Sequence, residues 1–232
     1  MAPSHLRVEH STAGYRQLLL ARPERRNALD LALARSLRDA LGEETSAPVV
    51  LGSTDPRVFC AGADLGVPDA DRAAVSDLVY ECCEIMITRP GPVIAVVGGA
   101  AVGGGAQLAA AADLRIAGPA ARLRWIGPAG LGLAVGAWVL TDLVGRGAAM
   151  ELALTGRWVG AAEALAMGLV NRVDDNPGEV AALIAGELAT QDPRSLAGVK
   201  SVAAAGGLLD RLRAEQQLNR SAWAQVIASA PG

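Results

Sequence analysis

The chain contains few histidines, the side chain that enzymes use most often as a general base. Its 232 residues include two histidines, His5 and His10, and both fall in an expected N-terminal strand. A Ser-His-Asp or Cys-His mechanism would therefore have no base. The sequence also has no GxSxG, no Walker A segment, and no GxGxxG after a strand. With one Phe, two Tyr and four Trp, it offers few rings for stacking on nucleic acid bases.

Cysteines are equally sparse. Cys60, Cys82 and Cys83 form no CxxC pair and no disulfide framework, and the two neighbours would bridge only with strain. We expect reduced thiols and a cytoplasmic location. Residues 1–10 lack the apolar segment of a signal peptide. No cluster of metal-binding side chains is apparent, so no metal is expected.

The charge balance excludes further classes of protein. A net charge of −3 gives no electrostatic footprint for nucleic acid, and 51% apolar residues indicate a globular chain. The stretch between Arg89 and Asp113 carries no charge and is long enough to cross a bilayer. Glycines, prolines and Gln107 interrupt it, so a buried strand, a glycine turn and a buried helix are predicted instead of a membrane span.

Short strands and helices alternate through the first part of the chain, which predicts an α/β fold. From about residue 134 the pattern becomes mostly helical, and residues 176–178, Asn-Pro-Gly, are interpreted as a linker. The strands are expected at 6–10, 15–20, 48–51, 58–60, 93–97, 114–117 and 170–173. The helices are expected at 31–41, 71–88, after the turn at 98–105, at 161–168, and as two or three helices within 179–226.

Two strand-to-helix turns are candidates for chemistry. One is Phe59–Leu65, whose small residues allow a ligand to approach the backbone. The other is Gly98–Gly105, which leads into a helix N-terminus with unpaired amide groups of partial positive charge. Two such donors aimed at one point would form an oxyanion hole. Ordinary tight turns, with glycine needed for packing, are the alternative.

In content and order, these turns and four further segments resemble the crotonase (enoyl-CoA hydratase/isomerase) superfamily. The resemblance covers nearly the whole chain. It is carried by residues 22–29 (RPERRNAL), 59–65 (FCAGADL), 98–113, 130–133 (GLGL), 143–145 (LVG) and 161–173.

The resemblance implies a crotonase-type ββα spiral core in residues 1–175 and a C-terminal α-helical oligomerisation region in residues 176–232. The oxyanion donors would be the N–H groups of Ala63 and Gly104. The substrate would be an acyl-CoA thioester, with no cofactor besides its coenzyme A. A homotrimer or a dimer of trimers is expected. Contacts to coenzyme A and substrate are expected from Arg26, Ala28, Leu29, Ala61, Asp64 and Leu65.

The expected acid–base pair is missing. Hydratases of this family use two Glu residues, at positions that here hold Gln107 and Pro128. Gln can hydrogen-bond but cannot transfer a proton, and Pro can do neither. Gln107 lies one turn into the glycine-rich helix, and its side chain is expected to point toward the thioester.

No other carboxylate has an evident claim to that role. Asp64 is interpreted as an N-cap that begins a helix. Asp113 is expected to hold the strand after the glycine-rich helix, and Asp142 and Glu151 are expected on solvated helix faces.

Three functions remain open. The first is an enzyme of the enoyl-CoA hydratase/isomerase class, a lyase or isomerase of fatty acid metabolism, with hydratase activity weak or absent. The second is a non-catalytic acyl-CoA binder or carrier in lipid metabolism. Under either of these two functions, we expect the protein to bind long- or medium-chain acyl-CoA. The third is a structural partner of a related active subunit.

Overall fold

The computed structural model describes residues 5–43, 45–127, 130 and 132–229. The larger of two sheets in this part of the chain is mostly parallel, and only its first two strands pair antiparallel. In spatial order it contains β1 (Leu6–His10), β2 (Arg16–Leu20), β3 (Val49–Ser53), β5 (Val93–Val97), β7 (Leu114–Ala117) and β10 (Arg172–Val173).

A second, smaller sheet carries the two turns of interest. Its strands, in spatial order, are β4 (Val58–Cys60), β6 (Ala100–Val102), β8 (Arg122–Arg124) and β9 (Val159–Gly160). The first three are parallel, and β9 closes the sheet antiparallel to β8.

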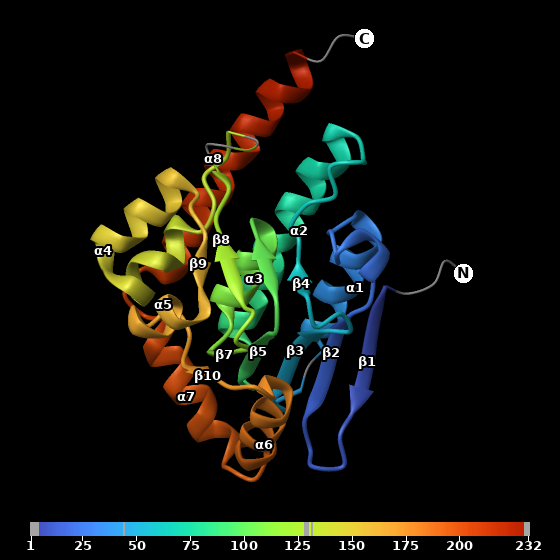
Figure 1. Cartoon of the computed structure of the whole chain (residues 1–232), viewed down its shortest axis with the longest axis vertical. Coiled ribbons are helices and arrows are strands. Elements are labelled where there is room, and N and C mark those ends of the chain that lie inside the picture. Colours follow the sequence, from blue (N-terminus) through green and yellow to red (C-terminus); the bar gives the residue numbers. More distant parts are fainter. Residues whose placement is uncertain (1–4, 44, 128–129, 131, 230–232) are drawn as a thin grey trace.

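Helices surround both sheets (Figure 1). They are α1 (Leu31–Leu41), α2 (Asp69–Thr88), α3 (Gly104–Ala111), α4 (Ala137–Thr155), α5 (Ala161–Ala166), α6 (Pro177–Ala189), α7 (Pro193–Ala204) and α8 (Leu208–Ser229). A single 3-10 turn, η1 (Pro23–Arg25), precedes α1. Alternating strands and helices in the first part and helices in the last confirm the predicted α/β class.

Local sequence explains most of these boundaries. The Asp30 side chain caps α1 by accepting a 2.8 Å hydrogen bond from the Leu33 N–H. Leu33, Leu37 and Leu41 lie on one face of α1 and are buried. β5 is β-branched and almost wholly buried, as expected for a parallel strand with both faces covered.

The structure corrects the sequence interpretation at three places. Residues 100–102, read as part of a turn, form β6, because their backbone groups pair with β4 and β8. The strands β8 and β9 were not predicted, because their residues show no clear strand pattern. The expected linker at 176–178 instead begins α6, with Pro177 in the first helical turn, where the missing N–H costs nothing.

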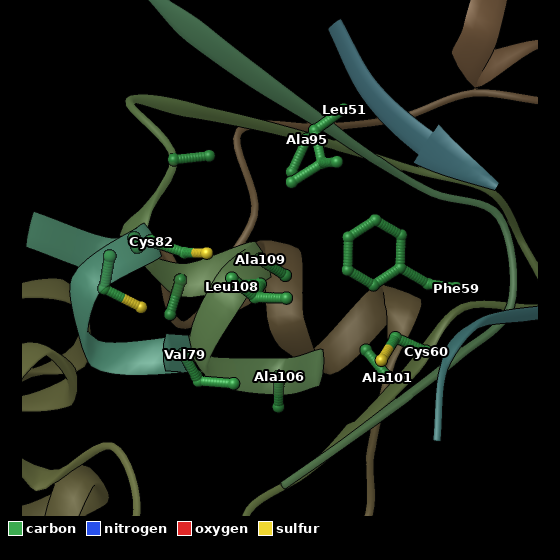
Figure 2. Packing of buried hydrophobic residues seen from close by; sticks show 14 of the residues in the cluster. Leu51, Phe59, Cys60, Val79, Cys82, Ala95, Ala101, Ala106, Leu108 and Ala109 are labelled. Atoms are coloured by element: carbon green, nitrogen blue, oxygen red, sulfur yellow. The ribbon is translucent and has the colours of Figure 1, made fainter. Parts of the chain in front are cut away.

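Helix α3 forms the centre of the main hydrophobic core. Figure 2 shows its Ala106, Leu108 and Ala109 beside Val79 and Cys82 of α2. Small side chains allow α3 to pack closely between α2 and the strands.

The C-terminal helices cover different parts of the body. α6 packs on β3, β5 and β7, whereas α8 packs along α2 and also contacts α4. In Figure 1, α2 and α8 extend toward the same end of the molecule. Within the part of the chain that the structure describes, no helix is long and apolar enough to span a bilayer.

Candidate active site

The two turns meet because they follow adjacent parallel strands. β4 and β6 pair in parallel, with Cys60 opposite Ala101. The carboxyl ends of both strands therefore lie at one edge of the small sheet, where ligands of α/β proteins commonly bind. Residues 61–64 and 103–105 leave the sheet at this edge.

Glycines allow the two turns to approach each other closely. Gly62 has a φ of +87°, and a Cβ at this position would lie 2.8 Å from the Val102 carbonyl oxygen and 3.5 Å from the Gly104 nitrogen. A Cβ on Gly105 would lie 2.4 Å from the Cys60 carbonyl oxygen. Larger residues would push α3 away from β4 and separate the turns.

The Ala63 and Gly104 amides are both placed as open donors. The Gly62 carbonyl accepts from the Leu29 N–H at 2.7 Å, and the Asp64 N–H donates to the Leu29 carbonyl at 2.9 Å, so the Ala63 N–H points away from this pairing. Gly104 is the first residue of α3, where an amide has no partner within the helix. Among the loop and cap hydrogen bonds of the described residues, neither amide is a donor.

Ala63 and Gly104 both line one cavity of about 280 Å³. Its walls come from both turns and from α2, α3, α8 and the segment before α4. The lining is mainly apolar. Its described residues are Ala61, Gly62, Ala63, Leu65, Arg72, Val75, Ser76, Val79, Val102, Gly103, Gly104, Gln107, Ile126, Gly130, Leu133, Val135, Asn219 and Trp223.

No carboxylate is found among the described lining residues, and Arg72 is the charged one. The Arg72 guanidinium pairs with Asp69 and lies 5.9 Å from the centroid of the Trp223 ring. Pro128 lies outside the described residues.

Gln107 occupies a fixed position at the cavity wall. It is 4% exposed, and its Oε1 accepts a 2.9 Å hydrogen bond from the indole N–H of Trp138. Trp138 belongs to α4 and does not line the cavity. Gln107 thus lines the cavity while its Oε1 is turned to Trp138. That its side chain points toward a bound thioester stays a prediction.

The segment that carries Trp138 is held by a buried carboxylate of α8. Glu215 accepts hydrogen bonds from the Tyr80 hydroxyl at 2.8 Å, from the Gly136 N–H at 2.8 Å and from the Trp138 N–H at 3.1 Å. Burial raises the pKa of Glu215 above its usual value, although these donors oppose the shift. Asn219, one turn further on, donates to the Ala134 carbonyl at 2.6 Å and accepts from the Ala134 N–H at 2.9 Å.

Cys60 lies directly before the first turn but is not a plausible nucleophile. It is fully buried, and burial raises the pKa of its thiol to about 12. The thiol donates to the Asn27 carbonyl at 3.1 Å. At neutral pH it is therefore protonated.

The residues expected to contact coenzyme A fall into two groups. Ala61 and Leu65 line the cavity, and Leu65 is 70% exposed at its edge. Arg26, Ala28 and Leu29 do not line it, although this segment pairs directly with the first turn, as in the 3.1 Å hydrogen bond from the Ala61 N–H to the Arg26 carbonyl.

Asp64 does not begin a helix, contrary to the sequence interpretation. α2 starts at Asp69, and the Asp64 side chain instead accepts from the Gly66 N–H at 2.9 Å and from Arg22 at 2.7 Å. The carboxylate therefore has its hydrogen-bond partners in the turn at Gly66 and in the distant Arg22. The spacing of residues in the sequence does not reveal the contact with Arg22.

Three other carboxylates also lie away from the cavity. Asp142 pairs with Arg211, and Glu151 pairs with Arg157 at 2.9 Å, both on the surface. Asp113 accepts from the Val93 N–H at 2.7 Å and pairs with Lys200 at 2.6 Å, in agreement with the predicted structural role.

Sequence reasoning missed the contributions of α2 and α8 to the cavity. Arg72, Ser76, Asn219 and Trp223 line it, yet no motif marks them. Asn219 and Trp223 come from the region expected to serve oligomerisation. Their contribution depends on how α8 packs along α2.

Comparison with known proteins identifies the family of this chain. A family model described as enoyl-CoA hydratase/isomerase matches residues 11–230. A probable enoyl-CoA hydratase of Mycobacterium leprae is 38% identical over 69% of this chain and 68% of its own length. A putative enoyl-CoA hydratase/isomerase of Bacillus subtilis is 39% identical over 67% of this chain and 64% of its own length, so the chain aligns with about two thirds of each relative.

Solved structures share the fold. The crystal structure of an enoyl-CoA hydratase from Bacillus anthracis matches with a TM-score of 0.81 at 31% identity, covering 97% of this chain and 92% of that one. A putative enoyl-CoA hydratase from Streptomyces coelicolor matches with a TM-score of 0.79 at 32% identity, covering 99% and 90%. The chain therefore belongs to the enoyl-CoA hydratase/isomerase family, also known as the crotonase superfamily.

Proposed function

We propose that the protein binds acyl-CoA thioesters, with the carbonyl oxygen between the N–H groups of Ala63 and Gly104 and the acyl chain in the cavity. The observation that carries this proposal is the meeting of two open backbone donors on one apolar cavity. The names of the relatives, which refer to enoyl-CoA, support coenzyme A as the carrier. Coenzyme A is here part of the ligand itself, so the proposal includes no separate cofactor.

Such a site stabilises negative charge on the thioester oxygen. Preorganised donors in an apolar cavity stabilise an enolate more strongly than the neutral thioester, and removing one donor of this kind typically costs about 10²- to 10³-fold in rate. Proton transfer needs an additional acid or base, worth about 10²- to 10⁴-fold each. Without a carboxylate among the described lining residues, the site is better suited to binding and polarising a thioester than to hydrating it.

This balance favours a non-catalytic acyl-CoA binder or carrier in lipid metabolism over an active hydratase. The competing candidate is an enzyme of the hydratase/isomerase class that draws its acid or base from outside the cavity walls described above. The two candidates predict different rates of turnover but the same binding of acyl-CoA.

Calorimetric titration with acyl-CoA of several chain lengths, with free coenzyme A as a control, tests the proposal. Two variants at Gly104 test the backbone donor. Gly104→Pro removes the N–H at the first position of a helix, where proline is tolerated, and its ring fills the space in front of the nitrogen. Gly104→Ala keeps the N–H and adds a Cβ that meets Leu29 and Val79 at an ordinary 3.5 Å.

We expect acyl-CoA to bind more tightly than free coenzyme A, Gly104→Ala to bind like the parent, and Gly104→Pro to bind more weakly. A lost hydrogen bond to a thioester carbonyl corresponds to about 0.5–1.5 kcal/mol. The proposal fails if no chain length gives heat or thermal stabilisation.

A further inference from the structure

The orientation of the Gln107 amide is determined by its partner. An indole N–H only donates, so the Gln107 atom that faces Trp138 at 2.9 Å must be the oxygen. The nitrogen, with two N–H donors, is then directed away from Trp138. Within the described part of the chain, it donates no hydrogen bond to another residue.

That nitrogen is open to the cavity. Some side-chain nitrogens of the described residues are fully enclosed and have no hydrogen-bond partner, such as the indole nitrogens of Trp125 and Trp223. The Gln107 amide nitrogen has no partner either, but it is not fully enclosed. Gln107 as a whole is nearly buried and lines the cavity, so the remaining exposed part of its amide faces that space. The cavity therefore receives an unused amide donor.

The position of Gln107 relative to Gly104 indicates which part of a bound acyl chain its amide would meet. Gln107 follows Gly104 by three positions on α3, so the two lie on the same face of the helix. A thioester oxygen at the Gly104 N–H lies within about one helical turn, about 5 Å, of the Gln107 side chain. The acyl β-carbon, two bonds beyond the carbonyl carbon, falls in the same range.

We infer that Gln107 makes the site selective for thioesters with an oxygen on the acyl β-carbon, that is, 3-oxo- or 3-hydroxyacyl-CoA, over saturated or α,β-unsaturated ones. This inference rests on the proposed thioester binding. A β-oxygen accepts from the Gln107 amide, whereas a hydrocarbon leaves that buried donor without a partner, which is costly. Trp138 is the positioning residue, because it prevents the amide from turning its oxygen toward the ligand.

The test compares four-carbon ligands that differ at the β-carbon: butyryl-, crotonyl-, acetoacetyl- and 3-hydroxybutyryl-CoA. Dissociation constants are measured by calorimetry. We expect acetoacetyl-CoA to bind about 3- to 10-fold more tightly than butyryl-CoA, the range of one neutral hydrogen bond. 3-Hydroxybutyryl-CoA should follow acetoacetyl-CoA, and crotonyl-CoA should resemble butyryl-CoA.

Three variants assign the preference to the amide. Gln107→Met removes the donor, and Gln107→Glu removes it while keeping an acceptor for Trp138. Trp138→Phe keeps the amide but frees it to rotate. We expect the first two to abolish the preference and the third to reduce it. A merely structural role would weaken all four ligands equally and leave their ratios unchanged.

The outcomes separate the two proposals. Equal binding of butyryl- and acetoacetyl-CoA, or a preference that survives both Gln107 variants, overturns the inference and leaves thioester binding in place. Failure of every ligand to bind, long-chain acyl-CoA included, overturns both. Because Gln107→Glu preserves the contact with Trp138, it provides the answer if Gln107→Met does not fold.

Discussion

Trp138 on α4 donates its indole N–H to the Gln107 side chain on α3 at 2.9 Å. This bond joins two helices through residues that are 31 positions apart in the chain. Trp138 is in turn held through its backbone N–H by Glu215 of α8, at 3.1 Å. The C-terminal helix thus influences the wall of the cavity through a chain of specific hydrogen bonds.

Hydration of crotonyl-CoA is expected to be slow. Gln107 cannot transfer a proton, and no described lining residue is a carboxylate. We expect turnover at least about 10²-fold below that of a typical enzyme, for which kcat is about 10 per second. Loss of enoyl absorbance after mixing with purified protein measures it.

Gln107→Glu should recover only a little of this activity, because the second position is Pro128. Gln107→Met is the matched control and should recover none. Turnover of the parent protein at ordinary enzymatic rates would contradict the prediction. It would also require a carboxylate such as Asp142 or Glu151 to reach the cavity.

Gly105→Ala should destabilise the protein. Its Cβ would lie 2.4 Å from the Cys60 carbonyl oxygen, so α3 must shift away from β4. We expect a loss of about 1–3 kcal/mol in the free energy of unfolding, measured by urea denaturation.

Gly147→Ala is the control for this substitution. Gly147 lies on the exposed side of α4, and a Cβ there would meet nothing within 4 Å. Alanine should stabilise the helix by about 0.4–1 kcal/mol. Equal effects of the two substitutions would show that the contact between α3 and β4 is not tight.

The Asp64 carboxylate should give a pH-dependent contribution to stability. Hydrogen bonds from the Gly66 N–H and from Arg22 hold the pKa of Asp64 below its usual 3.8. A lowered folded-state pKa stabilises the fold above pH 3.8, and this stabilisation is lost as pH falls through the folded-state value. Asp64→Asn should therefore cost about 1.5–3 kcal/mol at pH 7 and progressively less in acid.

Urea midpoints measured from neutral pH down to below pH 3.8 check this dependence. Asp142→Asn serves as a comparison, because its exposed pair with Arg211 should be worth less than about 1 kcal/mol. A difference between parent and Asp64→Asn that stays constant across the pH range would refute the assignment.

Self-association is also expected, with a homotrimer as the main species. In the region after Pro177, the sequence offers seven apolar positions for such contacts, and six are covered within the chain: Leu212 is fully buried, and Val180, Ile184, Leu188, Leu208 and Leu209 pack against the two cores. The seventh, Leu183, is 70% exposed, and Val199 (70%), Val202 (77%) and Leu218 (59%) are exposed as well. Val199 and Val202 are three positions apart on α7, so they lie on one face of that helix, where adjacent exposed apolar residues offer a contact for a second copy of the chain.

Sedimentation over a range of concentrations measures the assembly. We expect the double substitution Val199→Asp and Val202→Asp to shift the protein toward the monomer. A parent protein that remains monomeric at every concentration would contradict the prediction.

Much of the fold was predictable because it depends on short-range patterns. The alternation of strands and helices, the cap at Asp30 and the glycine-rich turn before α3 are local features of the chain. The two turns could also be identified, since glycines at strand ends are visible in the sequence. The three-residue strand β6 was missed, because a strand so short is recognised mainly by the partners it pairs with.

The surroundings of the two turns depend on long-range packing. Residue spacing does not show that Arg22 satisfies Asp64, that Trp138 fixes the Gln107 amide, or that Asn219 and Trp223 reach the cavity from α8. Such contacts join segments between about 30 and 140 residues apart, and they form only when helices pack in one particular register. The chain's local patterns therefore predict where the backbone donors lie, whereas the packing of α2, α4 and α8 sets the shape and polarity of the cavity they face.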